Sequence, residues 1–171
     1  MRNSYRVEGD YVYIQLDRKA GSIVETKVSA SDLSKLLAYD VKWCLLDQKS
    51  PRFYVMANDF SAGKKKTVRL HRFILDPPGK LVVNHIDGDG LNNTRENLEI
   101  VTNQQNTIKR VRKNSNNTSG VRGVSYSKDR NKWEVKFRKS YKTFHFGRYS
   151  SKDDAERVAE QKFKELFSDI I

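Results

Sequence analysis

Apolar and polar residues alternate along the first part of the chain, which is the spacing of strands whose side chains point to opposite faces. The stretches "YVYIQL" and "SIVETKV" predict a β-hairpin over residues 4–28. Ser31 then precedes "DLSKLLAYD", where Leu33, Leu36 and Leu37 share one face, so a helix capped by Ser31 is expected. The stretches "RFYVMAND" and "KKTVRLHRFI" predict two further strands joined by the basic loop "SAGKKK".

A second patterned region lies near the end of the chain. Trp133, Val135 and Phe137 alternate with charged residues, which predicts an antiparallel sheet with an aromatic face, to which Phe144 and Phe146 are assigned, and a basic face. Ser150 or Ser151 can cap a following helix with five apolar residues at helical spacing, namely Ala155, Val158, Ala159, Phe163 and Leu166. This helix is expected to cover the aromatic face, leaving the basic face open.

The stretch between these regions, "NTIKRVRKNSNNTSG", is polar and basic and has no core pattern. It is interpreted as a linker that begins with the last turns of a helix. The sequence therefore predicts an α+β protein with an N-terminal α+β domain over residues 1–106, a basic linker at 107–119 and a sheet-plus-helix domain at 120–171.

Composition excludes several classes of protein. Hydrophobic residues make up 37% of the 171 residues, and no apolar run approaches the roughly 20 residues of a spanning helix. The first residues alternate and contain acids, unlike a signal peptide. The single cysteine, Cys44, excludes an internal disulfide and a cysteine-rich zinc site, and it is expected in the core. These features favour a cytoplasmic protein.

The net charge of +12 is unevenly distributed. Residues 107–152 carry 14 Lys and Arg against two acids, whereas residues 1–106 carry 16 against 13. Such a block is typical of a polyanion-binding surface, although a solvated basic surface is the alternative.

Candidate chemistry is concentrated in "VVNHIDGDGLNNTRENLEIVTNQQN", residues 82–106. A strand delivers Asn84 and His85 side by side, and "DGDG" predicts a turn. A neutral histidine can take a proton from water near neutral pH, and an asparagine oxygen is an acceptable ligand for Mg²⁺. A base, a weakly held cation and a basic surface together indicate phosphodiester hydrolysis.

The stretch from "HRFIL" at 71–75 through residue 106 resembles the HNH nucleases, specifically the phage and intron-encoded homing branch. The resemblance implies a ββα-metal unit over about residues 71–108 that cleaves double-stranded DNA with Mg²⁺ or Mn²⁺, one ion per active site. No structural zinc is expected, because the chain has only one cysteine. It places the general base on His85, the metal ligands on Asn84 and Asn106, and the loop-holding hydrogen bonds on Asn97.

The C-terminal region resembles the plant ethylene-response-factor (Apetala-type) DNA-binding domain, a three-stranded sheet packed on one helix. "RGV" at 122–124, "KWEVKFR" at 132–138, "FHFGRYS" at 144–150 and "DDAERVAEQKF" at 153–163 carry the resemblance. Lys136, Thr143 and His145 depart from the family's residue types, so the family's target sequence is not transferred. The DNA contacts expected here are Arg122, Lys128, Lys132, Lys136, Arg138, Thr143 and His145, with Arg110 and Arg112 of the linker.

Several residues leave alternatives open. His71 and Arg72 could contact the substrate or serve the structure, and Asp87 and Asp89 could assist a cation or form the turn. Because Asn84 and Asn106 are neutral, a DNA-binding protein with a degenerate nuclease site is the main alternative. An RNA-directed or less specific nuclease is the third hypothesis. One site per chain favours a monomer that nicks one strand, and a dimer that cuts both strands is the alternative. The resemblance implies a gene carried by a phage or an intron in a bacterial host.

Overall fold

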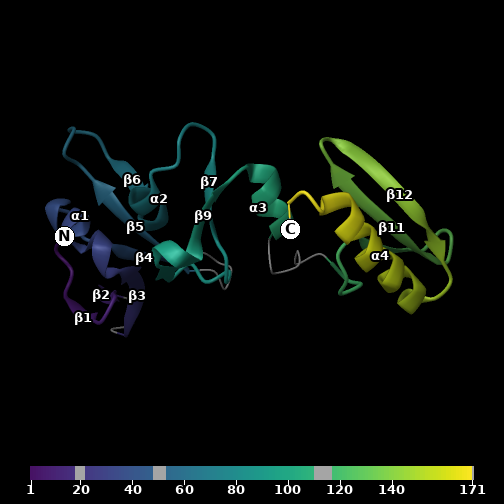
Figure 1. Cartoon of the computed structure of the whole chain (residues 1–171), viewed down its shortest axis with the longest axis horizontal. Helices are drawn as coiled ribbons and strands as arrows, with labels where there is room; N and C mark the ends of the chain where they lie inside the picture. Colours follow the sequence, from purple (N-terminus) through teal and green to yellow (C-terminus); the bar gives the residue numbers. More distant parts are fainter. Residues whose placement is uncertain (18–21, 48–52, 110–116, 171) are drawn as a thin grey trace. The chain divides into compact units, whose positions relative to one another are not determined.

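The computed structural model describes residues 1–17, 22–47, 53–109 and 117–170. The chain divides into two compact units, Met1–Asn106 and Thr107–Ile171. In the described residues, several small sheets are mixed with four α-helices (Figure 1). None of the helices in these ranges is long and apolar enough to cross a membrane.

The first sheet of the N-terminal unit is built from the predicted hairpin. Val12, Ile14 and Leu16 alternate with more exposed residues and are fully buried, which explains why this segment pairs as a strand. The hairpin prediction is confirmed by the antiparallel pairing of the second and third strands. The sheet has the order β1 (Tyr5–Glu8), β2 (Tyr11–Asp17), β3 (Ile23–Ser29) and β8 (Asn92–Asn93), with β8 parallel to β3.

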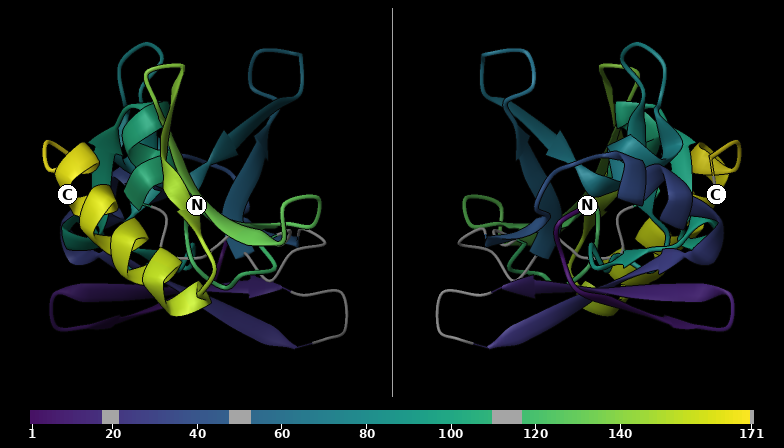
Figure 2. Two further views of the ribbon diagram at one scale, coloured as in Figure 1. Left: turned by 90° about the vertical axis from the view of Figure 1, so that its right-hand side faces the viewer. Right: turned by 90° about the vertical axis from the view of Figure 1, so that its left-hand side faces the viewer.

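A second sheet contains β4 (Cys44–Asp47), β5 (Phe53–Asp59) and β6 (Lys66–Arg69), and Figure 2 shows it separate from the first. The prediction that the strand continues through "LHRFI" was wrong, because α2 (Leu70–Leu75) begins immediately after β6. Leu70 and Ile74, four residues apart, both point into the core, which is the spacing of a helix.

Two local predictions at the start of the chain also fail. Ser31 does not cap a helix, since it lies inside the 3₁₀ turn Ala30–Asp32 that precedes α1 (Leu33–Ala38). Leu36 is fully buried, but its predicted partner Leu37 is 43% exposed.

Cys44 is exposed and not in the core. It begins β4, an edge strand, directly after Trp43. Successive side chains of an extended chain point to opposite sides, so the fully buried Trp43, which precedes the strand, leaves the cysteine on the outward side.

The segment with the candidate chemistry forms a small antiparallel sheet. β7 (Val82–His85) pairs with β9 (Leu98–Val101), which follows the 3₁₀ turn Arg95–Asn97. The next helix, α3 (Asn103–Lys109), includes the first three residues of the predicted linker, and residues 110–116 lie outside the described residues.

The C-terminal unit consists of one sheet and one long helix. The sheet contains β10 (Val124–Ser127), β11 (Lys132–Lys139) and β12 (Lys142–Tyr149), and α4 (Lys152–Phe167) packs on one of its faces (Figure 1). Ser151 caps α4 by accepting a hydrogen bond from the Asp153 N–H at 3.2 Å.

The core of this unit is centred on Phe137. Its ring contacts the rings of Phe146, Phe163 and Phe167, and the last of these was not expected in the core. Phe144, which was assigned to the aromatic face, is 37% exposed. It lies on β12, an edge strand, so no further strand covers it.

Candidate functional site

His85 is the best-defined chemical group of the N-terminal unit. It ends β7, where it faces Leu98 of β9, and only 7% of the residue is exposed. Its Nε2 lies 3.2 Å from Oδ1 of Asn93, which is fully buried on β8. The imidazole is therefore held by a side chain from a different sheet.

Two rings pack around this imidazole. His71 of α2 meets it edge to face, with centroids 5.1 Å apart, and Tyr54 of β5 lies 5.9 Å from it. Burial lowers the pKa of His85 below its ordinary value, although Asn93, Asp87 and Asp89 act in the opposite direction. His85 is therefore a neutral imidazole near pH 7, the form that accepts a proton.

His71 is buried beside His85. It is 4% exposed, and its buried Nδ1 has no hydrogen-bond partner among the described residues. Burial lowers the pKa of His71 to about 3, with a further contribution from neighbouring positive charge. Arg72 donates to the Leu81 carbonyl at 3.1 Å, so the structure gives it a backbone partner.

The loop after His85 is closed by Asn97. Its Nδ2 donates to Asp87 Oδ1 at 2.9 Å and to the Asn92 carbonyl at 2.8 Å, and its Oδ1 accepts from the Asp87 N–H at 3.1 Å. The Ile86 N–H donates to the Asn97 carbonyl. Asn97 thus fixes the chain directly after the candidate base.

Asp87 and Asp89 are both used by the turn. Asp87 accepts from the Asp89 N–H at 2.8 Å, and Asp89 accepts from the Leu91 N–H at 3.0 Å. Partial burial raises the pKa of Asp87, but hydrogen bonds from Asp89, Asn92 and Asn97 outweigh it and hold the pKa below the ordinary value. Both carboxylates therefore form the turn, as one of the two alternatives proposed.

Gly90 allows this loop to lie directly on β5. A Cβ at this position would come 2.0 Å from the Phe53 carbonyl oxygen and 2.9 Å from the Tyr54 ring. Only glycine permits such a close approach of two backbones. This contact holds the loop beside the ring that packs against His85.

Asn84 has a carboxylate neighbour that the sequence analysis did not identify. It faces Glu99 across the β7–β9 pair, and its Nδ2 donates to Glu99 Oε1 at 2.8 Å. The sequence could have indicated this neighbour only through the register of the strand pair, which places Asn84 opposite Glu99. Asn106 lies on α3, and no hydrogen bond joins its side chain to Asn84 or His85 in the described ranges.

The oxygen atoms of the Asn84 and Glu99 side chains fit a weakly held magnesium ion. No group of three or more His, Cys, Asp or Glu that could hold a metal is present in the described part of the chain. Asparagine and glutamate nevertheless offer oxygen atoms, and Mg²⁺ commonly takes only one or two protein ligands and completes its shell with water and phosphate. The amide oxygen of Asn84, with the Glu99 carboxylate beside it, thus has the chemistry to ligate such a cation.

The predicted DNA contacts of the C-terminal unit are distributed over two faces. Lys136 lies opposite His145, and Arg138 lies opposite Thr143, in the β11–β12 pair. All four are exposed, as are Lys128 and Lys132. Exposed Arg148, which was not predicted, forms an ion pair of 2.6 Å with Glu134 on the outward face.

Arg122 lies elsewhere. Its guanidinium donates to the Ile108 carbonyl and lies 5.1 Å from the centre of the Phe163 ring on α4. It is thus placed at the helix side of the sheet. Arg110 and Arg112 lie outside the described residues.

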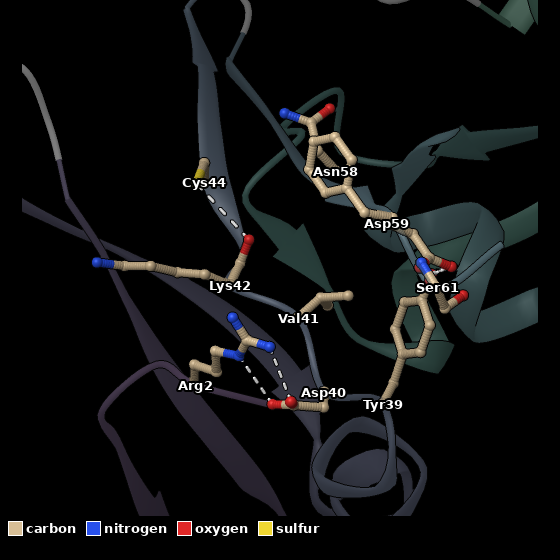
Figure 3. A pocket seen from close by; sticks show the side chains of 10 residues that line it. Arg2, Tyr39, Asp40, Val41, Lys42, Cys44, Asn58, Asp59 and Ser61 are labelled. Carbon is tan, nitrogen blue, oxygen red and sulfur yellow. Dashed lines mark hydrogen bonds and ion pairs between the residues drawn. The ribbon is translucent and has the colours of Figure 1, made fainter. Parts of the chain in front are cut away.

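A pocket of about 760 Å³ in the N-terminal unit contains none of these residues (Figure 3). Its charges are paired: Arg2 donates to Asp40 at 2.8 Å, and Tyr39 donates to Asp59 at 2.6 Å. Burial, followed by this bond, raises the pKa of Tyr39 to about 12, and the bond lowers that of Asp59 to about 2. Neither group titrates near neutral pH, so neither suits acid–base catalysis there.

Comparison with known proteins finds similarity to one family in the His85 segment. Residues 76–108 match the family model described as HNH endonuclease. The chain is 31% identical over 109 residues to the uncharacterized HNH endonuclease L560 of Acanthamoeba polyphaga mimivirus, covering 60% of this chain and 55% of the relative.

Two further relatives match shorter segments. The chain is 58% identical over 36 residues to the SPbeta prophage-derived protein YosQ of Bacillus subtilis (strain 168), named as an HNH homing endonuclease, covering 21% of each chain. It is 36% identical over 56 residues to protein 3.8 of Escherichia phage T7, covering 33% of this chain and 46% of the relative. The chain thus spans about half or less of these relatives, and no solved structure matches it.

Proposed function

We propose that this protein is a metal-dependent DNA endonuclease of the HNH homing type, which hydrolyses phosphodiester bonds at a preferred site in double-stranded DNA. The observation that carries the proposal is a buried, neutral His85 held by an amide network within the segment that matches the HNH model. The relatives named as HNH endonucleases support a nuclease.

In this proposal His85 takes the proton from the attacking water. The base is neutral because burial opposes its charged form, so it is ready to accept a proton near pH 7. Asn97 holds the following loop, and the rings of His71 and Tyr54 limit rotation of the imidazole.

Asn84 and Asn106 hold the cation with their amide oxygens in this proposal. A bound Mg²⁺ or Mn²⁺ supplies positive charge that stabilises the phosphate and the leaving 3′ oxygen. Because both ligands are neutral, the ion binds weakly until DNA adds phosphate oxygens. Chemistry is then coupled to the presence of substrate.

The C-terminal unit is proposed to be the DNA-reading module. Its outward β11–β12 face presents Lys136, Arg138 and His145 to solvent, and a sheet with such a face can enter the major groove. Linking two modules on one chain raises the local concentration of each at the site that the other holds. A monomer with one active site is expected to nick one strand.

The test is incubation of the full chain with supercoiled plasmid and Mg²⁺, or separately Mn²⁺, with an EDTA control and the variant His85→Ala. Relaxed circles that require the metal are expected, and the variant should be slower by about 10²- to 10⁴-fold, the usual contribution of a general base. Linear product would instead indicate cleavage of both strands.

A filter-binding assay on the same plasmid separates the main alternative. If the wild-type protein and His85→Ala bind DNA equally and neither cuts plasmids that carry a library of inserts, the chain is a DNA-binding protein with an inactive nuclease site. Cleavage of an RNA substrate in preference to the plasmid would favour the third hypothesis.

A further inference from the structure

We propose that Asn93 is a positioning residue that holds His85 in a single tautomer, with the proton on Nε2 and the lone pair on Nδ1. The assignment of a catalytic purpose rests on the proposed function, because it takes His85 as the base. The tautomer itself is a property of the folded chain and follows from hydrogen bonds alone.

The first step is the orientation of the Asn93 amide. Its Nδ2 lies 3.1 Å from the Gly90 carbonyl oxygen and 2.9 Å from Thr26 Oγ1. A backbone carbonyl only accepts hydrogen bonds, so the atom facing Gly90 must be the amide nitrogen. The reversed amide would place two oxygens 3.1 Å apart in a fully buried position.

Thr26 gives an independent reason for the same orientation. Its hydroxyl proton is donated to the Leu91 carbonyl at 2.7 Å, so its oxygen has only lone pairs left for Asn93. A hydroxyl used in this way requires a donor opposite it. Two separate partners therefore turn the nitrogen of Asn93 away from His85.

In the second step, the orientation of the Asn93 amide determines which nitrogen of His85 carries the proton. Oδ1 of Asn93 faces Nε2 of His85 at 3.2 Å, and an amide oxygen only accepts. Nε2 must therefore carry a proton. Because a neutral imidazole has one N–H, the lone pair that can take a proton from water is on Nδ1.

Nδ1 is available for that task. Nδ1 of His85 forms no hydrogen bond with any described residue. Nδ1 of His71 is buried and has no partner among these residues, whereas Nδ1 of His85 is not buried in this way. The amide network thus leaves the reactive nitrogen of His85 open and uses the other nitrogen to hold the ring.

This arrangement also gives a role to the N-terminal hairpin. Thr26 lies on β3, and β8 pairs with β3 through Val28 opposite Asn93. Leu91 is held there too, since it accepts from the Lys27 N–H at 2.9 Å. The strands at the beginning of the chain therefore orient a base that lies about sixty residues later.

The experiment is ¹⁵N NMR of the full chain at pH 8, which reports directly which ring nitrogen carries the proton. The chain has three histidines, and the His85 signals are assigned by their loss in His85→Gln. The proposal expects a single tautomer protonated on Nε2 in the wild-type protein. Protonation on Nδ1, or an equal mixture, overturns it whether or not the protein cuts DNA.

The variant Asn93→Leu removes the acceptor, and Asn3→Leu is its matched control. Asn3 is also a buried amide with two donated bonds, to Gln15 and Trp43, and one accepted bond, but it does not contact His85. Asn93→Leu should lower kcat by about 10- to 100-fold with KM unchanged and mix the tautomers, as expected when a supporting hydrogen bond is lost. Asn3→Leu should leave the tautomer unchanged.

Equal effects of the two variants on kcat and tautomer would show that Asn93 acts only on stability, against the proposal. If Asn93→Leu does not fold, Thr26→Val replaces it, because this variant removes one of the two partners that orient the amide. It should increase the minor tautomer, and an unchanged spectrum would contradict the network. A wild-type protein with the assigned tautomer but no nuclease activity would refute the proposed function and leave the hydrogen-bond assignment intact.

Discussion

The two units of this protein differ in the exposure of the polar side chains proposed to act in each. In the N-terminal unit His85, Asn93 and Asn97 are each less than 10% exposed. His85 is hydrogen-bonded to Asn93, and Asn97 is hydrogen-bonded to Asp87 in the loop that follows His85. In the C-terminal unit Lys136 and Arg138 are exposed on the outward face of a sheet.

The difference follows from the tasks proposed for the two units. Removing a proton from water requires a base whose lone pair has a fixed direction, and a buried network supplies that. Attraction of a polyanion depends on net positive charge and works through the field of exposed cations. Mutations should therefore affect stability in the first unit and salt-dependent binding in the second.

The largest expected effect is that of Asn97→Ala on the stability of the N-terminal unit. Loss of three hydrogen bonds from a buried side chain removes a partner from two backbone groups and one of the hydrogen bonds that the Asp87 carboxylate accepts, which costs about 3 kcal/mol of unfolding free energy. Urea unfolding followed by Trp43 fluorescence in a Trp133→Phe background measures it.

The control for this prediction is Lys136→Ala on the exposed face, which should change stability by less than about 0.5 kcal/mol. If the two substitutions had equal effects, the contrast between the units would not hold at the level of stability.

The second effect is a loss of stability in acid caused by His71. Its folded pKa of about 3 is far below the roughly 6.5 of an unfolded histidine, so the unfolded chain binds a proton first as the pH falls. Stability is present above about pH 6.5 and is lost towards pH 3. Between pH 7 and pH 5 the contribution is about 2 kcal/mol, and the lowered pKa of His85 acts in the same direction.

The variant His71→Phe keeps a ring and cannot titrate. The difference in unfolding free energy between pH 7 and pH 5 should therefore be smaller in the variant by that amount, measured by urea titration at each pH. The same dependence in both proteins would place the acid sensitivity elsewhere.

The third effect concerns DNA binding by the outward face. The pair Lys136→Gln and Arg138→Gln should reduce the slope of log affinity against log salt concentration by about 2, because each lost phosphate contact removes about 0.9. Folding stability should be unaffected. Fluorescence anisotropy with a DNA duplex at several salt concentrations gives the slope.

The matched control removes the same charge from the same unit on its other side. Arg157 and Lys164 are exposed on α4, which covers the opposite face of the sheet. Changing both to glutamine should leave the slope unaltered. Equal slopes for the two double variants would mean that net charge, and not this face, binds DNA.

The smallest effect is a gain in stability from Tyr141→Gly in the turn between β11 and β12. Ser140 and Tyr141 have φ of 47° and 64°, which glycine adopts without strain, and the Tyr141 ring is 93% exposed, so little packing is lost. A gain of about 0.5–1 kcal/mol is expected. Slower amide hydrogen exchange in β11 and β12 would show it, whereas Tyr141→Ala should show no gain.

The sequence was sufficient where a feature depends on neighbouring residues. Alternation over β2 determined which residues enter the core, and the spacing of Ala155, Ala159 and Phe163 determined the buried side of α4. It also predicted one candidate site from His85, Asn84, Asn97 and Asn106, whereas Asn93, which contacts His85, was not among them. These features follow from strand and helix periods, which are local properties of the chain.

The tertiary structure decided whatever depends on residues distant in sequence. Only folding brings Thr26 and Asn93 together, seats Gly90 against Phe53, and buries His71 against His85. The same reason accounts for the outward Cys44 and the helical α2, because burial of Trp43 and Leu70 overrides the local pattern. The sequence named the candidate base, and the packing of distant strands determined which of its nitrogens is free.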